Sequence, residues 1–263
     1  MKRIAWILIL CFVVAVSIAA AESESGTIET IYTEFENWDQ QAKDYDHQTV
    51  VGLYTAVELL EVIAEATDKD GQYTENISQV MDTLVETDKS AETVYQQEAN
   101  GAYRMAEMLV VIAGALNPDG QNWPQIQGVM DTLREGDNIA DNAETQLANG
   151  IYRSCELLCL IAQELDKESQ YTSEIEEVQN WMAGTDNSLA NATEQIAFGS
   201  VSAAMYVGII DTILDKNGQY SEYVNSKIQQ VNSFRNDLSY TQVNGIYRMV
   251  DLLQVWGYCA GVK

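Results

Sequence analysis

A five-residue motif returns along this chain at a nearly fixed interval. Three copies read Asn-Gly-x-Tyr-Arg and two keep only part of the motif: Asn100–Arg104, Asn149–Arg153, Asn244–Arg248, Val51–Tyr54 and Phe198–Val201. The motif glycines are Gly52, Gly101, Gly150, Gly199 and Gly245, so successive intervals are 49, 49, 49 and 46 residues. A period of this length is typical of arrays of like structural units, in which each unit buries its apolar face against the next.

The residues between the motifs favour helix. The two prolines, Pro118 and Pro124, lie close together, and the other stretches are rich in good helix formers. The segment 101–116 is apolar around nearly its whole circumference, which is typical of a buried helix. The segment 77–84 carries a single apolar stripe, which is typical of a half-exposed helix. The sequence therefore predicts an all-α array of αα-hairpins, with motif-bearing helices inside and striped helices outside.

A predicted helix stop follows each of the first four motif glycines by nineteen residues. The four stops are Gly71, Gly120, Ser169 and Gly218. Glycine accepts the left-handed backbone that ends a helix, and an Asp or Asn just before it supports the turn. Asp68 and Asp70 also resemble the opening of a calcium loop, but the fifth and twelfth positions hold Gln72 and Gln79, which an EF-hand does not use. We therefore prefer a helix-ending turn and keep a weak calcium site at Asp68 and Asp70 as the alternative.

Residues 22–263 are predicted to form a single helical-repeat domain. Apolar residues in the half unit 27–51 match the outer stripe that returns 49 residues later, so this half unit has an outer helix only. Full units start at residues 52, 101, 150 and 199, and the terminal half unit 245–263 has an inner helix only. The two half units are complementary. Three outcomes stay open: a ring of five pairs closed within one chain, head-to-tail assembly between chains, or an open solenoid with locally packed ends.

The first 21 residues are predicted to be a secretory signal peptide. A basic start at Lys2 and Arg3 precedes an apolar run over 4–20, which ends in small residues at 19–21. The expected location is therefore extracellular, at the cell surface or periplasmic. An uncleaved membrane anchor is the alternative, and we expect no later stretch to span a membrane.

The net charge of −26 restricts the class of partner. A field of this sign repels nucleic acid and anionic membranes and favours cations and basic partners. We therefore expect no binding of nucleic acid, and membrane contact only through an uncleaved anchor.

Three motif copies place an arginine three residues before an acid on an otherwise apolar helix. The residues of this pattern, with a first copy that lacks the arginine, are Tyr54 and Glu58; Tyr103, Arg104 and Glu107; Tyr152, Arg153 and Glu156; and Tyr247, Arg248 and Asp251. One interpretation is a binding row of guanidinium groups and tyrosines, suited to carboxylates or sugars, in a groove or ring lumen. The other is a structural ladder in which the arginine bridges to an acid of its own or the neighbouring unit. Repetition favours the ladder, which predicts that Glu58 pairs with Arg104.

No catalytic or cofactor motif stands out, and no cofactor is expected. The single histidine, His47, excludes His-rich metal sites and most Ser–His arrangements. We therefore expect a secreted or cell-surface, non-enzymatic scaffold that binds a protein partner or copies of itself, with head-to-tail self-assembly as one form. Cations and carbohydrate are further candidate ligands. The alternative is a polysaccharide hydrolase or lyase on a small α/α toroid, which needs paired carboxylates in one cleft.

Overall fold

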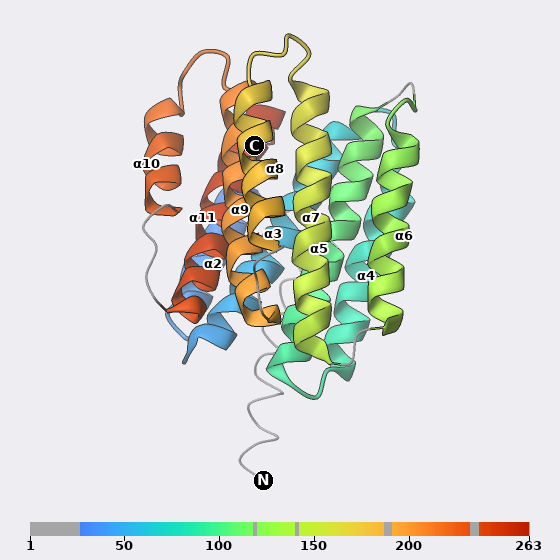
Figure 1. Ribbon diagram of the computed structural model, residues 1–263, viewed down its shortest axis with the longest axis vertical. Helices are drawn as coiled ribbons and strands as arrows, with labels where there is room; N and C mark the ends of the chain where they lie inside the picture. Colours follow the sequence, from blue (N-terminus) through green and yellow to red (C-terminus); the bar gives the residue numbers. More distant parts are fainter. Residues whose placement is uncertain (1–26, 118–119, 140–141, 187–190, 232–236, 263) are drawn as a thin grey trace.

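The computed structural model describes residues 27–117, 120–139, 142–186, 191–231 and 237–262. These residues form ten helices and no strand. The helices run up and down a single bundle (Figure 1). The helices are α2 (Ile28–Asp39), α3 (Tyr45–Thr67), α4 (Thr74–Ser90), α5 (Val94–Leu116), α6 (Trp123–Ile139), α7 (Ala143–Leu165), α8 (Thr172–Asp186), α9 (Ala192–Leu214), α10 (Ser221–Val231) and α11 (Leu238–Ala260). The prediction of an all-α fold is confirmed. The predicted signal peptide at 1–21 lies outside the described residues.

Five of the helices, which we call the inner helices, carry most of the buried apolar side chains. They are α3, α5, α7, α9 and α11, and each has 23 residues. In chain order α3 packs on α5, α5 on α7, α7 on α9 and α9 on α11, and α11 packs in turn on α3. Each inner helix therefore has two inner neighbours, which explains why its sequence is apolar on several sides.

Each inner helix follows a capping residue that lies eight places before its motif glycine. The N-caps are Asp44, Thr93, Asn142, Asn191 and Asp237, and each side chain accepts the backbone N–H three residues later. Such caps satisfy one of the amides that a helix start leaves without a partner. The buried segment recognised at 101–116 thus extends upstream to Val94, and the motif glycine lies inside the helix as its eighth residue.

The inner helices α3, α5, α7 and α9 are followed by the predicted left-handed turns. Gly71, Gly120, Ser169 and Gly218 have φ of 67°, 67°, 54° and 69°. The Asp68 carboxylate accepts the backbone N–H groups of Gln72 and Tyr73 at 2.9 and 2.8 Å, and Asp166 and Asp215 do the same in their turns. The helix-ending role is therefore the one observed. Among the described residues no group of three or more His, Cys, Asp or Glu side chains is arranged to hold a metal, and both carboxylate oxygens of Asp68 accept hydrogen bonds within the turn.

The other five helices, which we call the outer helices, lie against the inner ones and bury one face each. In α4 this face consists of Ile77, Val80, Met81, Leu84 and Asp88. Outer helices α4 and α6 each contact two successive inner helices, and α2 contacts both α3 and α11. The first outer helix is therefore shared between the first and last inner helices.

One described helix, α9, is long and apolar enough to cross a membrane by length and composition alone. The expectation that no later stretch has this character was therefore wrong. In the structure 72% of its apolar window is buried inside the bundle. Contacts with α7 and α11 and with two outer helices account for an apolar composition on all sides.

Candidate functional site

The motif glycines allow the inner helices to approach closely, and they do so in the same way in each copy. A Cβ atom built on Gly101 would lie 2.9 Å from the Leu53 Cβ and 3.1 Å from the Tyr54 ring. The other glycines meet the residues one and two places after the preceding motif glycine: Gly150 meets Ala102 and Tyr103, Gly199 meets Ile151 and Tyr152, Gly245 meets Ser200 and Val201, and Gly52 meets Ile246 and Tyr247. Neighbouring inner helices therefore run in the same direction, at nearly the same level.

The motif tyrosines donate hydrogen bonds to aspartates near the ends of outer helices. Tyr54 Oη donates to Asp88 at 2.8 Å, and Gln97 donates to the same carboxylate oxygen at 2.8 Å. Tyr247 and Gln48 share Asp39 in this way, at 2.6 and 2.9 Å. Each set of three ties an inner helix to the outer helix beside it and to the start of the following inner helix.

The same arrangement recurs at Tyr103, which hydrogen-bonds Asp137, while Gln146 donates to Asp137 at 2.8 Å. The motif asparagine adds a further bond, since Asn149 donates to the Tyr103 hydroxyl at 2.9 Å and to the Leu133 carbonyl at 3.0 Å. Sequence reasoning missed these aspartates and glutamines. Their signal was present, because Asp39, Asp88 and Asp137 also recur every 49 residues, each followed nine residues later by a glutamine.

The motif arginines pair with the acid one turn later in their own helix. The N–O distances are 3.1 Å for Arg104–Glu107, 3.0 Å for Arg153–Glu156 and 3.1 Å for Arg248–Asp251. The Nε atom of each arginine is buried and makes no hydrogen bond to any described residue. For Arg104 the 3.1 Å ion-pair contact involves Nε itself but is not a hydrogen bond. Each arginine is thus paired with one acid, and Arg248 also donates to the Gln230 side chain. The buried Nε atoms are the donors that stay without a hydrogen-bond partner among the described residues.

The ladder interpretation predicts an ion pair between Glu58 and Arg104, and this prediction is wrong. Arg104 pairs instead with Glu107 inside α5. The ionisable neighbours that act on Glu58 are Glu34 and Glu61, both acids. Burial first, and then these two carboxylates, raise the pKa of Glu58 to about 8. In the first copy of the pattern, Glu58 therefore lacks the arginine that pairs with the acid in the other copies.

The last copy joins the two ends of the chain. Asp251 in α11 accepts hydrogen bonds from Tyr32 of α2 at 2.5 Å and from Lys227 of α10 at 3.0 Å, and it also pairs with Arg248. Burial, together with the bond to Asp251, raises the pKa of the Tyr32 hydroxyl, so this group stays a donor at any physiological pH. Ile28 of α2 also packs on Gly257 of α11. A Cβ atom added to Gly257 would lie 2.5 Å from the Ile28 side chain.

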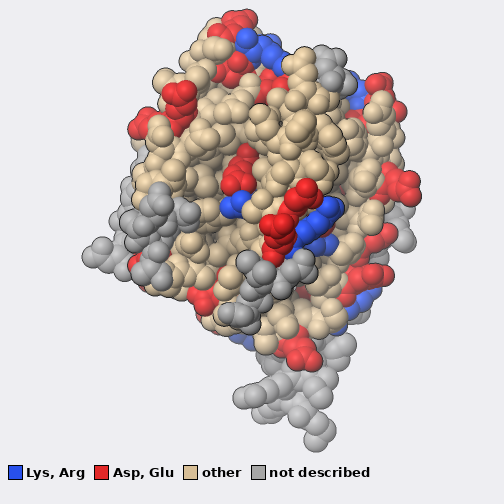
Figure 2. Space-filling view, turned by 45° about the vertical axis from the view of Figure 1, so that its right-hand side comes forward, with Lys and Arg blue, Asp and Glu red and all other residues tan. Residues whose placement is uncertain are grey.

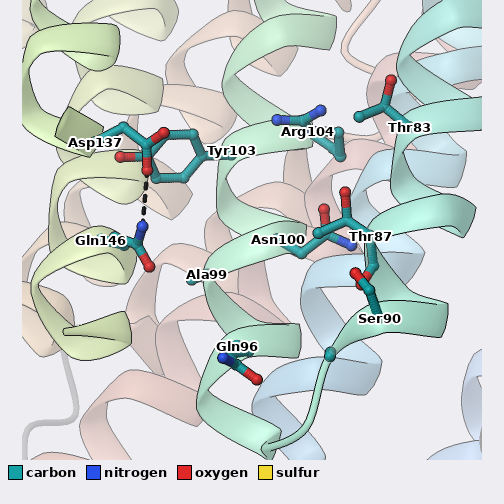
Figure 3. Close-up of a pocket in the computed structure, with 11 residues that line it drawn as sticks. Thr83, Thr87, Ser90, Gln96, Ala99, Asn100, Tyr103, Arg104, Asp137 and Gln146 are labelled. Carbon is teal, nitrogen blue, oxygen red and sulfur yellow. Dashed lines mark hydrogen bonds between the residues drawn. The ribbon is translucent and has the colours of Figure 1, made fainter.

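Two grooves lie between successive outer helices, over the motif tyrosines and arginines. The α4–α6 groove has a volume of about 340 Å³ and contains Tyr103 and Arg104. Its other polar groups include Thr83, Thr87, Gln96, Asn100, Asp137 and Gln146. Figure 3 shows Asp137, Tyr103 and Gln146 on one side of this groove, with Asn100, Thr87 and Ser90 on the other. Hydroxyl and amide groups therefore dominate its lining.

The α6–α8 groove repeats the arrangement one unit later. Its volume is about 430 Å³, and it contains Tyr152, Arg153 and Glu156 together with more apolar residues such as Met182. Figure 2 shows a hollowed, largely uncharged face on which acidic and basic groups lie side by side. The structure thus places two of the predicted Tyr-Arg pairs in equivalent grooves on the outside of the bundle.

The lining of these grooves limits the chemistry available in them. Two-carboxylate glycoside hydrolysis requires acids on both sides of the bond to be broken. Among the described residues, the acid that lines the α4–α6 groove is Asp137 and the acid that lines the α6–α8 groove is Glu156. Cys155 and Cys159 contribute to the second groove, but burial raises the pKa of both thiols, which disfavours the nucleophilic thiolate. The grooves are therefore equipped for hydrogen bonding and ion pairing.

Comparison of the chain with protein-family models, curated proteins and solved structures gives no match.

Proposed function

We propose that this chain is a non-enzymatic binding scaffold, built as a ring of five αα pairs closed within one molecule. Its binding surface is the series of outer grooves that contain the Tyr-Arg pairs. The ligand chemistry that fits these grooves is a surface of hydroxyl or carboxylate oxygens. On the strength of the predicted signal peptide at 1–21, we further propose that the scaffold acts outside the cytoplasm.

Contacts between the two ends of the chain support closure within one molecule. Gly52 packs on Ile246 and Tyr247 of the last motif copy. The remaining motif glycines pack in the same way on the motif copy that precedes them in the chain. Tyr247 donates to Asp39 as Tyr54 donates to Asp88. These contacts use both half units inside one chain, so head-to-tail assembly would have to break them. This favours a closed monomer over a filament.

The observation that carries the binding role is the recurrence of the same groove one unit later. Tyr103 and Arg104 in the α4–α6 groove correspond to Tyr152 and Arg153 in the α6–α8 groove. Repeated sites of like chemistry suit a ligand that itself repeats, or that extends over two units. Each guanidinium is held by one acid, and its remaining N–H groups can bind acceptor oxygens of a ligand.

The polysaccharide hydrolase or lyase is the weaker candidate. It requires one cleft with paired acids, whereas the described lining of each of these two similar grooves includes a single acid.

The test is a binding screen of the purified protein against two ligand panels, one of neutral and uronic-acid oligosaccharides and one of acidic peptides. Arg104→Gln and Arg153→Gln should each weaken binding at least about tenfold, the scale of one charge-assisted hydrogen bond. Arg134→Gln is the matched control, because Arg134 pairs with Asp131 on the exposed face of α6. The panel that binds identifies the ligand class. Absence of binding to both panels, equal binding by the groove variants, or release of new reducing ends from a polysaccharide would contradict the proposal.

A further inference from the structure

A second polar feature lies at the end of the bundle where the inner helices begin. Asp46, Tyr95, Glu144 and Thr193 are the second residues of α3, α5, α7 and α9. Since neighbouring inner helices start at the same level, these four side chains form a row, which we call the rim. Tyr95 hydrogen-bonds Asp46, and the Thr193 hydroxyl donates to Glu144 at 2.5 Å. The rim is thus acidic and partly tied together by its own hydrogen bonds.

One turn further into the bundle lies Glu98, the fifth residue of α5. Its side chain is 1% exposed, and its Oε1 atom has no hydrogen-bond partner among the described residues. The corresponding residues of the other inner helices are uncharged: Thr49, Leu147, Ile196 and Gln242. Gln242 and Thr49 satisfy each other through a hydrogen bond of 3.0 Å. Glu98 is therefore the single acid in a buried layer, and packing alone does not require it.

The ionisable groups that act on Glu98 are all acids. They are Asp46 of α3, Asp44 at the N-cap of α3, and Glu144 of α7. Burial first, and then these carboxylates, raise the pKa of Glu98 to about 8. The Oε1 atom of Glu98 is buried without a hydrogen-bond partner among the described residues, and a positive charge placed among these groups would favour the ionised form of Glu98.

Aromatic side chains beside the acids indicate the kind of cation. Tyr95 is 50% exposed and Tyr45, the first residue of α3, is 40% exposed. Exposed aromatic faces next to carboxylates attract ammonium and guanidinium groups. A metal ion fits less well, because no group of three metal-ligating side chains among the described residues is arranged to hold one. An organic cation on a flexible stem can reach Glu98 without such an arrangement.

We propose that the rim residues Asp46, Tyr95 and Glu144, together with the buried Glu98, form a binding site for an ammonium or guanidinium group. The group is carried either by a small polyamine or by a lysine or arginine side chain of a basic peptide. The site is separate from the outer grooves, so it goes beyond the binding role proposed above. Binding requires Glu98 to be ionised, and its affinity should therefore rise as pH increases from 6 towards 9.

The test is calorimetric titration of the purified protein with spermidine, with arginine amide, with a lysine-rich peptide and with calcium chloride. Glu98→Gln should weaken binding of the organic cations at least tenfold and abolish the rise of affinity with pH. Glu75→Gln is the control, because Glu75 is an exposed first-turn acid of α4. Thermal unfolding of each variant verifies folding, and glutamine already occupies the corresponding position in α11.

The outcomes are distinct. Tighter binding of spermidine supports a polyamine ligand, and tighter binding of the peptide supports a partner side chain. Saturation by calcium without binding of any organic cation overturns the proposal, as does unchanged affinity in Glu98→Gln. Arg104→Gln should leave binding at the rim unaltered, so failure of the groove proposal and failure of this one can be told apart.

Discussion

The fully buried carboxyl of Asp211 provides a sharp prediction about stability. Asp211 lies in α9 with 0% exposure, and neither side-chain oxygen has a hydrogen-bond partner among the described residues. Burial, and then the charge of Asp215, raise its pKa well above the usual 3.8. The equivalent residues of three other inner helices are buried alanines: Ala64, Ala113 and Ala162. The surrounding packing therefore accepts alanine, and we expect Asp211→Ala to stabilise the protein.

The size of the effect follows from two contributions. Removing a buried polar group without a partner should contribute about 1–3 kcal/mol, reduced by the small void that the carboxyl leaves. The second contribution depends on pH. The folded pKa lies above the unfolded one, so the penalty is absent below about pH 4 and grows as pH rises. Each pH unit above the unfolded pKa adds about 1.4 kcal/mol until the folded pKa is reached. The gain from Asp211→Ala should therefore be larger at pH 7.5 than at pH 4.5.

Urea unfolding at these two pH values, followed by circular dichroism, measures both contributions. Asp82→Ala is the control, since Asp82 is exposed on α4 and should change stability little at either pH. An Asp211→Ala variant that is less stable than the parent would refute the reasoning, and so would a gain that is the same at both pH values.

Three further predictions concern packing, backbone and charge. Gly101→Ala should lower stability by about 1–3 kcal/mol in urea unfolding, because its Cβ would lie 2.9 Å from the Leu53 Cβ. Gly128→Ala in α6 should raise stability by up to about 1 kcal/mol, because there is open space around Gly128. Equal effects of the two substitutions would show that the motif glycines are not close contacts. Ser169→Gly should raise the melting temperature, since serine at φ 54° costs about 1 kcal/mol that glycine avoids; a lower melting temperature would contradict this. Glu58→Gln should stabilise the protein at pH 7 and have little effect near pH 4, because the folded pKa of about 8 lies above the ordinary 4.5; a stability difference that does not change with pH would rule this out.

The 49-residue period made much of the architecture predictable. It marked the equivalent positions, the buried helices and the turns, because packing imposes the same residue types wherever the same environment recurs. It did not mark the helix starts, since capping residues such as Asp44 and Thr93 differ from copy to copy while their role is the same. Sequence inspection therefore began the inner helices at the glycine.

The candidate site was less predictable, because its contacts join residues far apart in the chain. Tyr54 and Asp88 are 34 positions apart, and Tyr247 and Asp39 are 208 apart. Periodicity identifies which residues are alike but not which of them face one another. For the same reason the repeat pattern leaves open whether Arg104 pairs with Glu58 of the neighbouring unit or with the acid one turn away on its own helix, and the structure shows the pair with Glu107.

The central claim is that the first outer helix completes the last inner helix within one chain. The most direct test is a double-mutant cycle between Tyr247→Phe and Asp39→Asn, measured by urea unfolding of dilute protein whose monomeric mass is verified by light scattering. The cycle at Tyr54 and Asp88 serves as the internal reference. We predict coupling of about 0.5–3 kcal/mol for both pairs. Coupling at Tyr54–Asp88 with none at Tyr247–Asp39 would contradict closure of the ring.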